Sequence, residues 1–152
     1  MAGRAMRAVR VVRVVGVGLA LWACATTMAA KPPSLYQRLG GREGIRGVVD
    51  EFVAVVVADD RIKGRFAGLN PAAVEKLKTN LSDQICEAAG GPCSYLGRDM
   101  KATHRGMSIS DAEWSATVED LVKALEKRKV APEDQTALLG LLGPMKADIV
   151  GQ

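Results

Sequence analysis

The segment GGPCSYLGRDMKATHRGMSIS, residues 90–110, contains the only histidine of the 152-residue chain, His104. A single imidazole cannot supply a catalytic triad or a zinc site built from several histidines. It can be the one axial ligand of a prosthetic group, or an ordinary polar residue near a helix end. Met100 precedes His104 by four residues, so one helical turn places both side chains on the same face, where they could contact one flat ligand.

Both sides of this segment have the residue spacing of amphipathic helices. Before it, apolar residues recur every three or four positions in 45–56, and Asn70 and Pro71 cap and open a further helix. The apolar stripe of that helix contains two amides, Asn80 and Gln84. No alternating strand pattern and no internal repeat occurs.

Two more helices are expected after His104. Ser110 and Glu113 form a capping box before an apolar stripe that begins at Trp114, and Pro132 opens the last helix. We expect Gly143–Pro144 to bend that helix. Its residues expected to face inward are Leu138, Leu141, Leu142, Met145 and Ile149. The sequence therefore predicts an all-α domain over 31–152, with four long helices and an irregular insertion that ends at His104.

The first thirty residues have a different composition. Four arginines (Arg4, Arg7, Arg10 and Arg13) precede a ten-residue apolar run, Val14–Ala23. Ten helical residues at ~1.5 Å each span about half of the ~30 Å bilayer core. The pattern predicts an export signal over 1–30, in preference to a buried N-terminal helix, which would crowd four arginines at its start.

Two cleavage sites are compatible with this signal. Cleavage after Ala29 or Ala30 follows small residues, whereas LWAC at 21–24 is similar to the lipobox of bacterial lipoproteins, with Trp22 bulky for its position. Cleavage before Cys24 would allow a lipid to tether the domain to a membrane. We therefore expect an exported protein, either periplasmic or anchored on the periplasmic side of the membrane.

Removal of the signal leaves a neutral domain. Four of the 21 basic residues lie in 1–30, which leaves 17 basic and 17 acidic residues, so the net charge of +4 comes from the signal. We therefore expect no nucleic-acid binding. In an oxidising compartment Cys86 and Cys93 can form a disulfide, because a turn between them brings their Cα atoms within range. Neither cysteine lies in a CxxCH motif for covalent haem attachment.

The chain lacks the residues that several kinds of catalytic and binding site require. The chain has no GxSxG, no GxxxxGK[ST] and no second histidine, which excludes the corresponding hydrolase, nucleotide and zinc sites. Haem iron, in contrast, can be held by one axial imidazole, which leaves its sixth position open to a gas. The composition is thus compatible with chemistry that needs a single protein ligand.

Three blocks of the sequence resemble the group 1 truncated haemoglobins. They are LYQRLGGREGIRGVVDEF (35–52), ADDRIKGRFAG (58–68) and GGPCSYLGRDMKATHRGMSIS (90–110), in the same order and with similar separations. The match extends from Leu35 to about Ile149. The resemblance implies a globin-like two-over-two helical sandwich that binds haem b non-covalently.

The resemblance also implies roles for individual residues. His104 matches the proximal iron ligand, and Phe66 matches a phenylalanine that packs against the haem near its distal side. Other matching positions are Met100 and Ile109 on the proximal side and Leu77 and Leu81 on the distal wall, with Lys76, Arg98 and Lys101 as candidates to bind the haem propionates. Ordinary core packing is compatible with these apolar positions, and a solvated surface position is the alternative for the three cations.

One position departs from the family pattern. Many members have a tyrosine immediately after the phenylalanine of the second helix, and its hydroxyl bonds the bound gas. In this chain Phe52 is followed by Val53, which offers no hydroxyl. Gln84, and after it Asn80, are the polar groups on the facing stripe that could replace the tyrosine.

Three functions follow. The first is reversible binding of dioxygen, or of another diatomic gas such as carbon monoxide or nitric oxide, as in oxygen binding and transport. The second is an enzyme that converts nitric oxide to nitrate or reduces peroxide with an unidentified reductant. Peroxide chemistry benefits from a distal acid or base, which Val53, Leu77 and Leu81 do not provide. The third is a structural helical bundle in which His104 is incidental.

Overall fold

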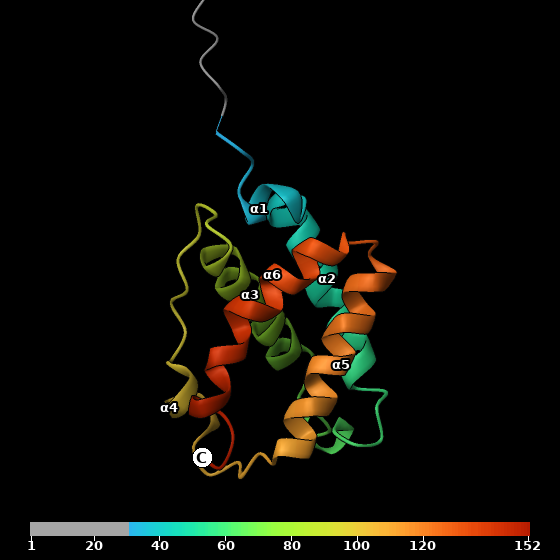
Figure 1. The fold of residues 1–152 in the computed structure, drawn as a ribbon. Coiled ribbons are helices and arrows are strands. Elements are labelled where there is room, and N and C mark those ends of the chain that lie inside the picture. Colours follow the sequence, from blue (N-terminus) through green and yellow to red (C-terminus); the bar gives the residue numbers. More distant parts are fainter. Residues whose placement is uncertain (1–30) are drawn as a thin grey trace, which may run out of the picture. The chain divides into compact units, whose positions relative to one another are not determined.

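The computed structural model describes residues 31–152, so the expected export signal and Cys24 lie outside the described residues (Figure 1). The described chain is helical, and its one β pairing is an isolated bridge between Ile109 and Val150. None of its helices has the length and hydropathy needed to cross a membrane. The elements are α1 (Leu35–Arg38), α2 (Gly41–Val56), the 3-10 helix η1 (Lys63–Arg65), α3 (Pro71–Ala88), α4 (Met100–His104), α5 (Asp111–Lys127), α6 (Pro132–Leu142) and the 3-10 helix η2 (Gly143–Asp148).

Local sequence signals set the helix ends. The Asn70 side chain accepts a hydrogen bond of 2.9 Å from the backbone N–H of Ala73 and so caps α3. Ser110 and Glu113 form the expected capping box at the start of α5. Between α1 and α2 the chain turns through Gly40 and Gly41, with φ of 85° and 68°, values that residues with a Cβ rarely adopt.

The valine-rich stripe of α2 forms the centre of the core. Helix α2 packs against both α3 and α5, and α6 packs against α1 and α5 (Figure 1). The pairs α2–α3 and α5–α6 give the two-over-two arrangement that the resemblance implied. The buried residues of α2 are Ile45, Val48, Val49, Val53 and Val56, as the three- and four-residue spacing predicted.

The last helix differs from the expectation in two respects. The α-helix ends at Leu142, and the chain continues as the 3-10 helix η2 through Pro144, which has no N–H to continue an α-helical pattern. The prediction that Leu141 faces inward was wrong, because its side chain is 42% exposed. Leu139 packs against the core instead, beside the fully buried Leu138.

The irregular chain around α4 is held at both ends. A disulfide joins Cys86 at the end of α3 to Cys93, with their Cα atoms 5.8 Å apart. After α4, the Ser108 N–H donates to the carbonyl of Gln152 at 2.7 Å, which fixes the C-terminus beside this loop. Asp99 caps α4 by accepting from the Ala102 N–H at 2.8 Å. The short helix that carries His104 is therefore tethered before and after its five residues.

Candidate functional site

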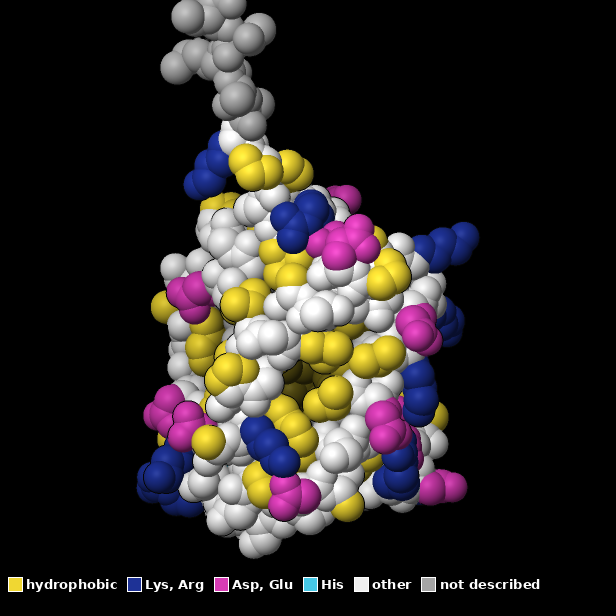
Figure 2. All heavy atoms as spheres, in the orientation of Figure 1, with side chains coloured by type: hydrophobic (Ala, Val, Ile, Leu, Met, Phe, Trp, Pro, Cys, Tyr) yellow, Lys and Arg dark blue, Asp and Glu magenta, His cyan; other side chains and the backbone are white. Residues whose placement is uncertain are grey.

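A large apolar cavity of about 610 Å³ lies inside the helical domain. Its walls come from α2, α3, α4, α5, α6 and η2, together with the loops around η1 and after α4. The face in Figure 2 is hollowed, and hydrophobic side chains surround the hollow. A concave, mostly apolar space of this size, with few polar groups, is typical of a small-molecule or cofactor site.

The cavity brings together most of the residues singled out from the sequence. Residues that line it are Phe52, Val53, Phe66, Leu77, Leu81, Gln84, Met100, His104 and Ile109. Asn80 is absent from the lining, and so are the three candidate propionate ligands Lys76, Arg98 and Lys101, whose side chains are exposed. The sequence gives the positions of these four residues along the chain, but it does not give the direction in which their side chains point.

His104 is oriented by the backbone of its own helix. Its Nδ1 lies 2.7 Å from the carbonyl oxygen of Met100, one turn earlier. A carbonyl only accepts, so Nδ1 carries the proton and donates, and Nε2 keeps the lone pair that binds a metal. The hydrogen bond from Nδ1 to the Met100 carbonyl fixes the ring and increases the basicity of Nε2, the nitrogen that would bind iron.

The residues around His104 fit haem better than a bare metal ion. Within 31–152 there is no group of three or more His, Cys, Asp or Glu side chains that could hold a metal ion directly. A haem supplies four nitrogen ligands of its own and needs one imidazole and an apolar cavity around it. Both are present here.

Gln84 contacts the side of the cavity that carries His104. Its amide nitrogen donates toward two thioether sulfurs, Met100 Sδ at 3.4 Å and Met145 Sδ at 3.3 Å. The sequence identified Gln84 as a polar group in the apolar stripe of α3. It could not show that the amide bonds to residues of α4 and η2.

An ion pair at the cavity lining was not foreseen. Arg65 bonds the carboxylate of Glu113 at 2.7 Å and 3.0 Å, and its third bond goes to the Met107 carbonyl at 2.7 Å. Arg65, with help from Ser110, lowers the pKa of Glu113 to about 2. The pair joins the end of η1 to the start of α5. Its partners lie 48 positions apart in the sequence, so only the fold reveals it.

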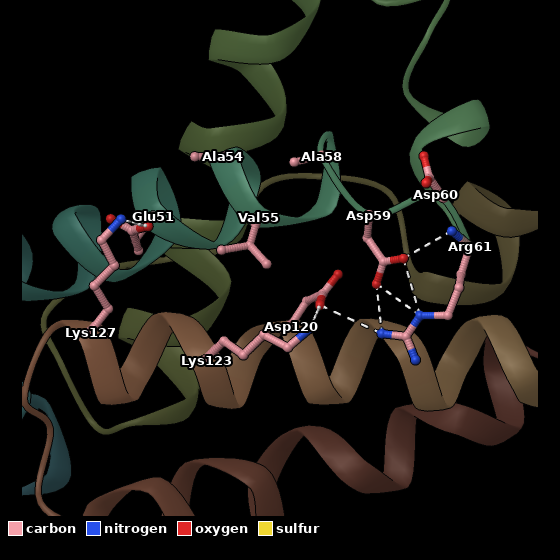
Figure 3. Close-up of a pocket in the computed structure, with 10 residues that line it drawn as sticks. All are labelled: Glu51, Ala54, Val55, Ala58, Asp59, Asp60, Arg61, Asp120, Lys123 and Lys127. Atoms are coloured by element: carbon pink, nitrogen blue, oxygen red, sulfur yellow. Dashed lines mark hydrogen bonds and ion pairs between the residues drawn. The ribbon is translucent and has the colours of Figure 1, made fainter.

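A second, charged depression of about 630 Å³ lies between the end of α2 and α5 (Figure 3). Asp59 and Glu119 both bind Arg61 at 2.6 Å, and this guanidinium holds the pKa of Asp59 well below its usual range. The fully buried Asp120 pairs with Lys123 at 2.7 Å. Because these carboxylates already have cationic partners, the depression is an ion-pair network that joins the two helices.

Comparisons with known proteins agree with the geometry. Residues 34–150 match the sequence profile of the bacterial-like globin. The chain is 33% identical over 120 residues to the group 1 truncated haemoglobin GlbN of Mycolicibacterium paratuberculosis. The aligned region covers 79% of this chain and 86% of that protein. The chain is 32% identical over 119 residues to GlbN of a Nostoc species, with coverage of 78% and 98%.

Solved structures resemble the fold as well. The 2/2 haemoglobin of Synechococcus, with covalently attached haem, aligns with a TM-score of 0.71 at 27% identity and covers 79% of this chain and 100% of that one. The Fe(III) truncated haemoglobin of Tetrahymena pyriformis aligns with a TM-score of 0.74 at 24% identity, with the same coverage. This second likeness concerns the fold alone.

Proposed function

We propose that His104 is the single protein ligand of the haem iron in this chain. The premise is that the chain belongs to the bacterial-like globin family, as a group 1 truncated haemoglobin. The chain is a haem b protein that binds a diatomic gas such as dioxygen. The haem, when bound, supplies the iron that coordinates the gas. The residues of the cavity position the haem and control the access of the gas to the iron.

The hydrogen bond between His104 and the Met100 carbonyl carries this proposal. It leaves Nε2 as the ring nitrogen with a free lone pair, on a side chain that lines the apolar cavity. Phe66, Leu77 and Leu81 contribute apolar surface that excludes water from the bound haem. The absorption spectrum of the purified protein, with and without carbon monoxide, tests the proposal together with a His104→Ala variant.

The propionate ligands remain part of the proposal. Haem carries two carboxylates that cations near the cavity mouth would bind. Lys76, Arg98 and Lys101 are exposed cations outside the cavity lining, and Arg65 is a cation within it. Arg65 is already paired with Glu113, so its charge is neutralised before a haem carboxylate arrives. The three exposed cations have no such competing partner at the cavity lining.

Gas binding is favoured over peroxide chemistry on the same iron. A peroxidase or a nitric oxide dioxygenase needs an electron donor, and peroxide cleavage also needs a distal acid or base. Val53, Leu77 and Leu81 supply neither a proton nor an acceptor. Stopped-flow mixing of the oxygenated protein with nitric oxide would detect the dioxygenase reaction as rapid formation of nitrate.

Export to the periplasm is supported by two observations. Four arginines precede the apolar run Val14–Ala23. Disulfides persist mainly in oxidising compartments, and the domain has one between Cys86 and Cys93. Fractionation of cells that express the full chain locates the protein, and loss of membrane association in a Cys24→Ala variant would identify a lipid tether at that residue.

A further inference from the structure

Most of the side-chain hydrogen-bond donors that line the cavity already have partners within the protein. We infer that the cavity selects weakly polarised diatomic gases, carbon monoxide or nitric oxide, against dioxygen. The inference rests on the proposed haem binding at His104. The inference extends that function by naming the class of gas that a cavity wall without free hydrogen-bond donors favours.

The wall contributed by α2 and the middle of α3, at Leu77 and Leu81, has no donor. Val49, Phe52, Val53 and Val56 line it from α2, and Leu77 and Leu81 line it from α3. Each of these side chains is a hydrocarbon. Val53, at the position where the resemblance implies a tyrosine, is only 4% exposed, so water has little access to replace the missing hydroxyl.

The nearest polar alternative from α3 is occupied elsewhere. The Gln84 amide nitrogen faces the sulfurs of Met100 and Met145, at 3.4 Å and 3.3 Å. Met100 belongs to the helix of His104, and Met145 belongs to η2, which packs against that helix. This amide is thus directed toward the proximal elements of the cavity.

Other lining hydroxyls bond to the backbone. The Thr117 hydroxyl donates to the carbonyl of Glu113 at 2.8 Å, and the Thr103 hydroxyl donates to the carbonyl of Arg98 at 3.3 Å. A hydroxyl has a single proton, so neither group retains one for a ligand. Arg65 directs three of its five N–H groups to Glu113 and Met107.

Trp114 is the remaining lining side chain with an N–H group. Within residues 31–152 its indole nitrogen makes no hydrogen bond to a protein atom, and the ring lines the cavity from the first turn of α5. This indole N–H is therefore a donor that the test must exclude. A Trp114→Phe variant is therefore included in the test.

The physical consequence differs between gases. Bound dioxygen takes negative charge from the iron, and a donor to a charged acceptor slows its escape by about ten- to a hundredfold. Bound carbon monoxide and nitric oxide are less polarised and gain less from a donor. A cavity whose α2 and α3 walls offer dioxygen no free donor would therefore lose dioxygen quickly and hold the other two gases longer.

The test compares Val53→Tyr with Val53→Phe in the ferrous, haem-loaded full chain. The two variants differ by one hydroxyl, so the second controls for the volume of the ring. We expect Val53→Tyr to release dioxygen about ten- to a hundredfold more slowly than Val53→Phe. Carbon monoxide and nitric oxide should leave both variants at similar rates. Infrared spectra give an independent readout, because the hydroxyl should lower the C–O stretching frequency of bound carbon monoxide relative to Val53→Phe.

Two further variants can overturn the inference. If Gln84→Leu or Trp114→Phe accelerated dioxygen release about tenfold and left carbon monoxide release unchanged, that side chain would be a donor and the cavity would be built for dioxygen. A loss of packing would instead move both gases together, which agrees with the inference. An anaerobic competition between carbon monoxide and nitric oxide identifies which of the two is held longer.

Failure of the inference is distinguishable from failure of the proposed function. A purified wild-type chain with no haem spectrum, or with a spectrum that carbon monoxide does not change, contradicts both. A normal carbon monoxide complex with slow dioxygen release, abolished by Gln84→Leu or Trp114→Phe, contradicts the selectivity alone.

Discussion

The backbone carbonyl of Met100 accepts a hydrogen bond from His104 Nδ1 at 2.7 Å, within a helix of only five residues. The contact uses the main chain, so the Met100 side chain remains free to line the cavity and to meet Gln84. One short helix therefore supplies the imidazole, the group that orients it and part of the apolar wall. The positioning of His104 depends on how firmly α4 itself is held.

Asp99→Ala should loosen the haem. Asp99 caps α4 through the Ala102 N–H, and loss of a cap costs about 0.5 to 2 kcal/mol of helix stability. Transfer of haem to an excess of an acceptor apoprotein should be faster in this variant. Asp99→Asn is the matched control, because asparagine caps helices as well as aspartate does. Equal acceleration in both variants would show that the carboxylate acts in some other way.

Removal of the disulfide should destabilise the domain. Cys86 and Cys93 close a short loop, with a sequence separation of 7, and the loop-entropy relation gives a stabilisation of about 2 to 3 kcal/mol. The Cys86→Ala, Cys93→Ala double variant should lose about this much unfolding free energy in urea titrations. Titration of two free thiols at these positions in exported, unreduced protein would refute the bond.

Gly91→Ala should be destabilising for a steric reason. A Cβ at this position would overlap the Tyr36 ring and the Cys86 sulfur and carbonyl oxygen, and overpacking of this kind costs about 1 to 3 kcal/mol. Gly140→Ala provides the control, because nothing lies near a Cβ there and alanine favours the helix by about 1 kcal/mol. Thermal unfolding should therefore shift down for the first variant and up for the second. A shift of the same sign in both would refute the steric argument.

The Arg65–Glu113 pair should contribute to stability in a defined pH range. The pKa of Glu113 is about 2 in the folded chain, against 4.5 for a free glutamate. A folded-state pKa that is depressed gives stability above the unfolded value, which is lost as the pH falls from 4.5 toward 2.

Glu113→Gln tests this pH dependence. The variant should be less stable than the wild-type chain at neutral pH, and the difference should shrink as the pH falls through that range. Chemical unfolding at several pH values measures it. A constant difference from pH 7 to acid would show that a weaker hydrogen bond from the Ser110 N–H to the side chain of residue 113, and not the charge, accounts for the effect.

Local patterns predicted most of the fold. The caps at Asn70 and Ser110 and the apolar spacing of α2 depend on residues within one or two turns, so the sequence contains them directly. The prediction that Leu141 is buried was wrong, because spacing alone does not tell which side of an apolar stripe meets the neighbouring helix.

The candidate site was predictable in part for a similar reason. The uniqueness of His104 and the valine after Phe52 are visible in the sequence. The direction of the Gln84 amide depends on Met145, 61 positions away, and the Arg65–Glu113 pair spans 48 positions. Such contacts are set by packing between elements, which helix periodicity does not encode.

The visible absorption spectrum of His104→Ala, compared with that of the wild-type chain, tests the central claim most directly. No second histidine exists to replace the proximal ligand. The wild-type chain should purify with haem and shift its spectrum on addition of carbon monoxide, whereas the variant should lose stably bound haem or hold it in an altered, exchangeable state. Folding of the variant is checked by its far-ultraviolet circular dichroism. A folded His104→Ala protein with unchanged haem content and an unchanged spectrum would contradict the assignment of His104 as the iron ligand.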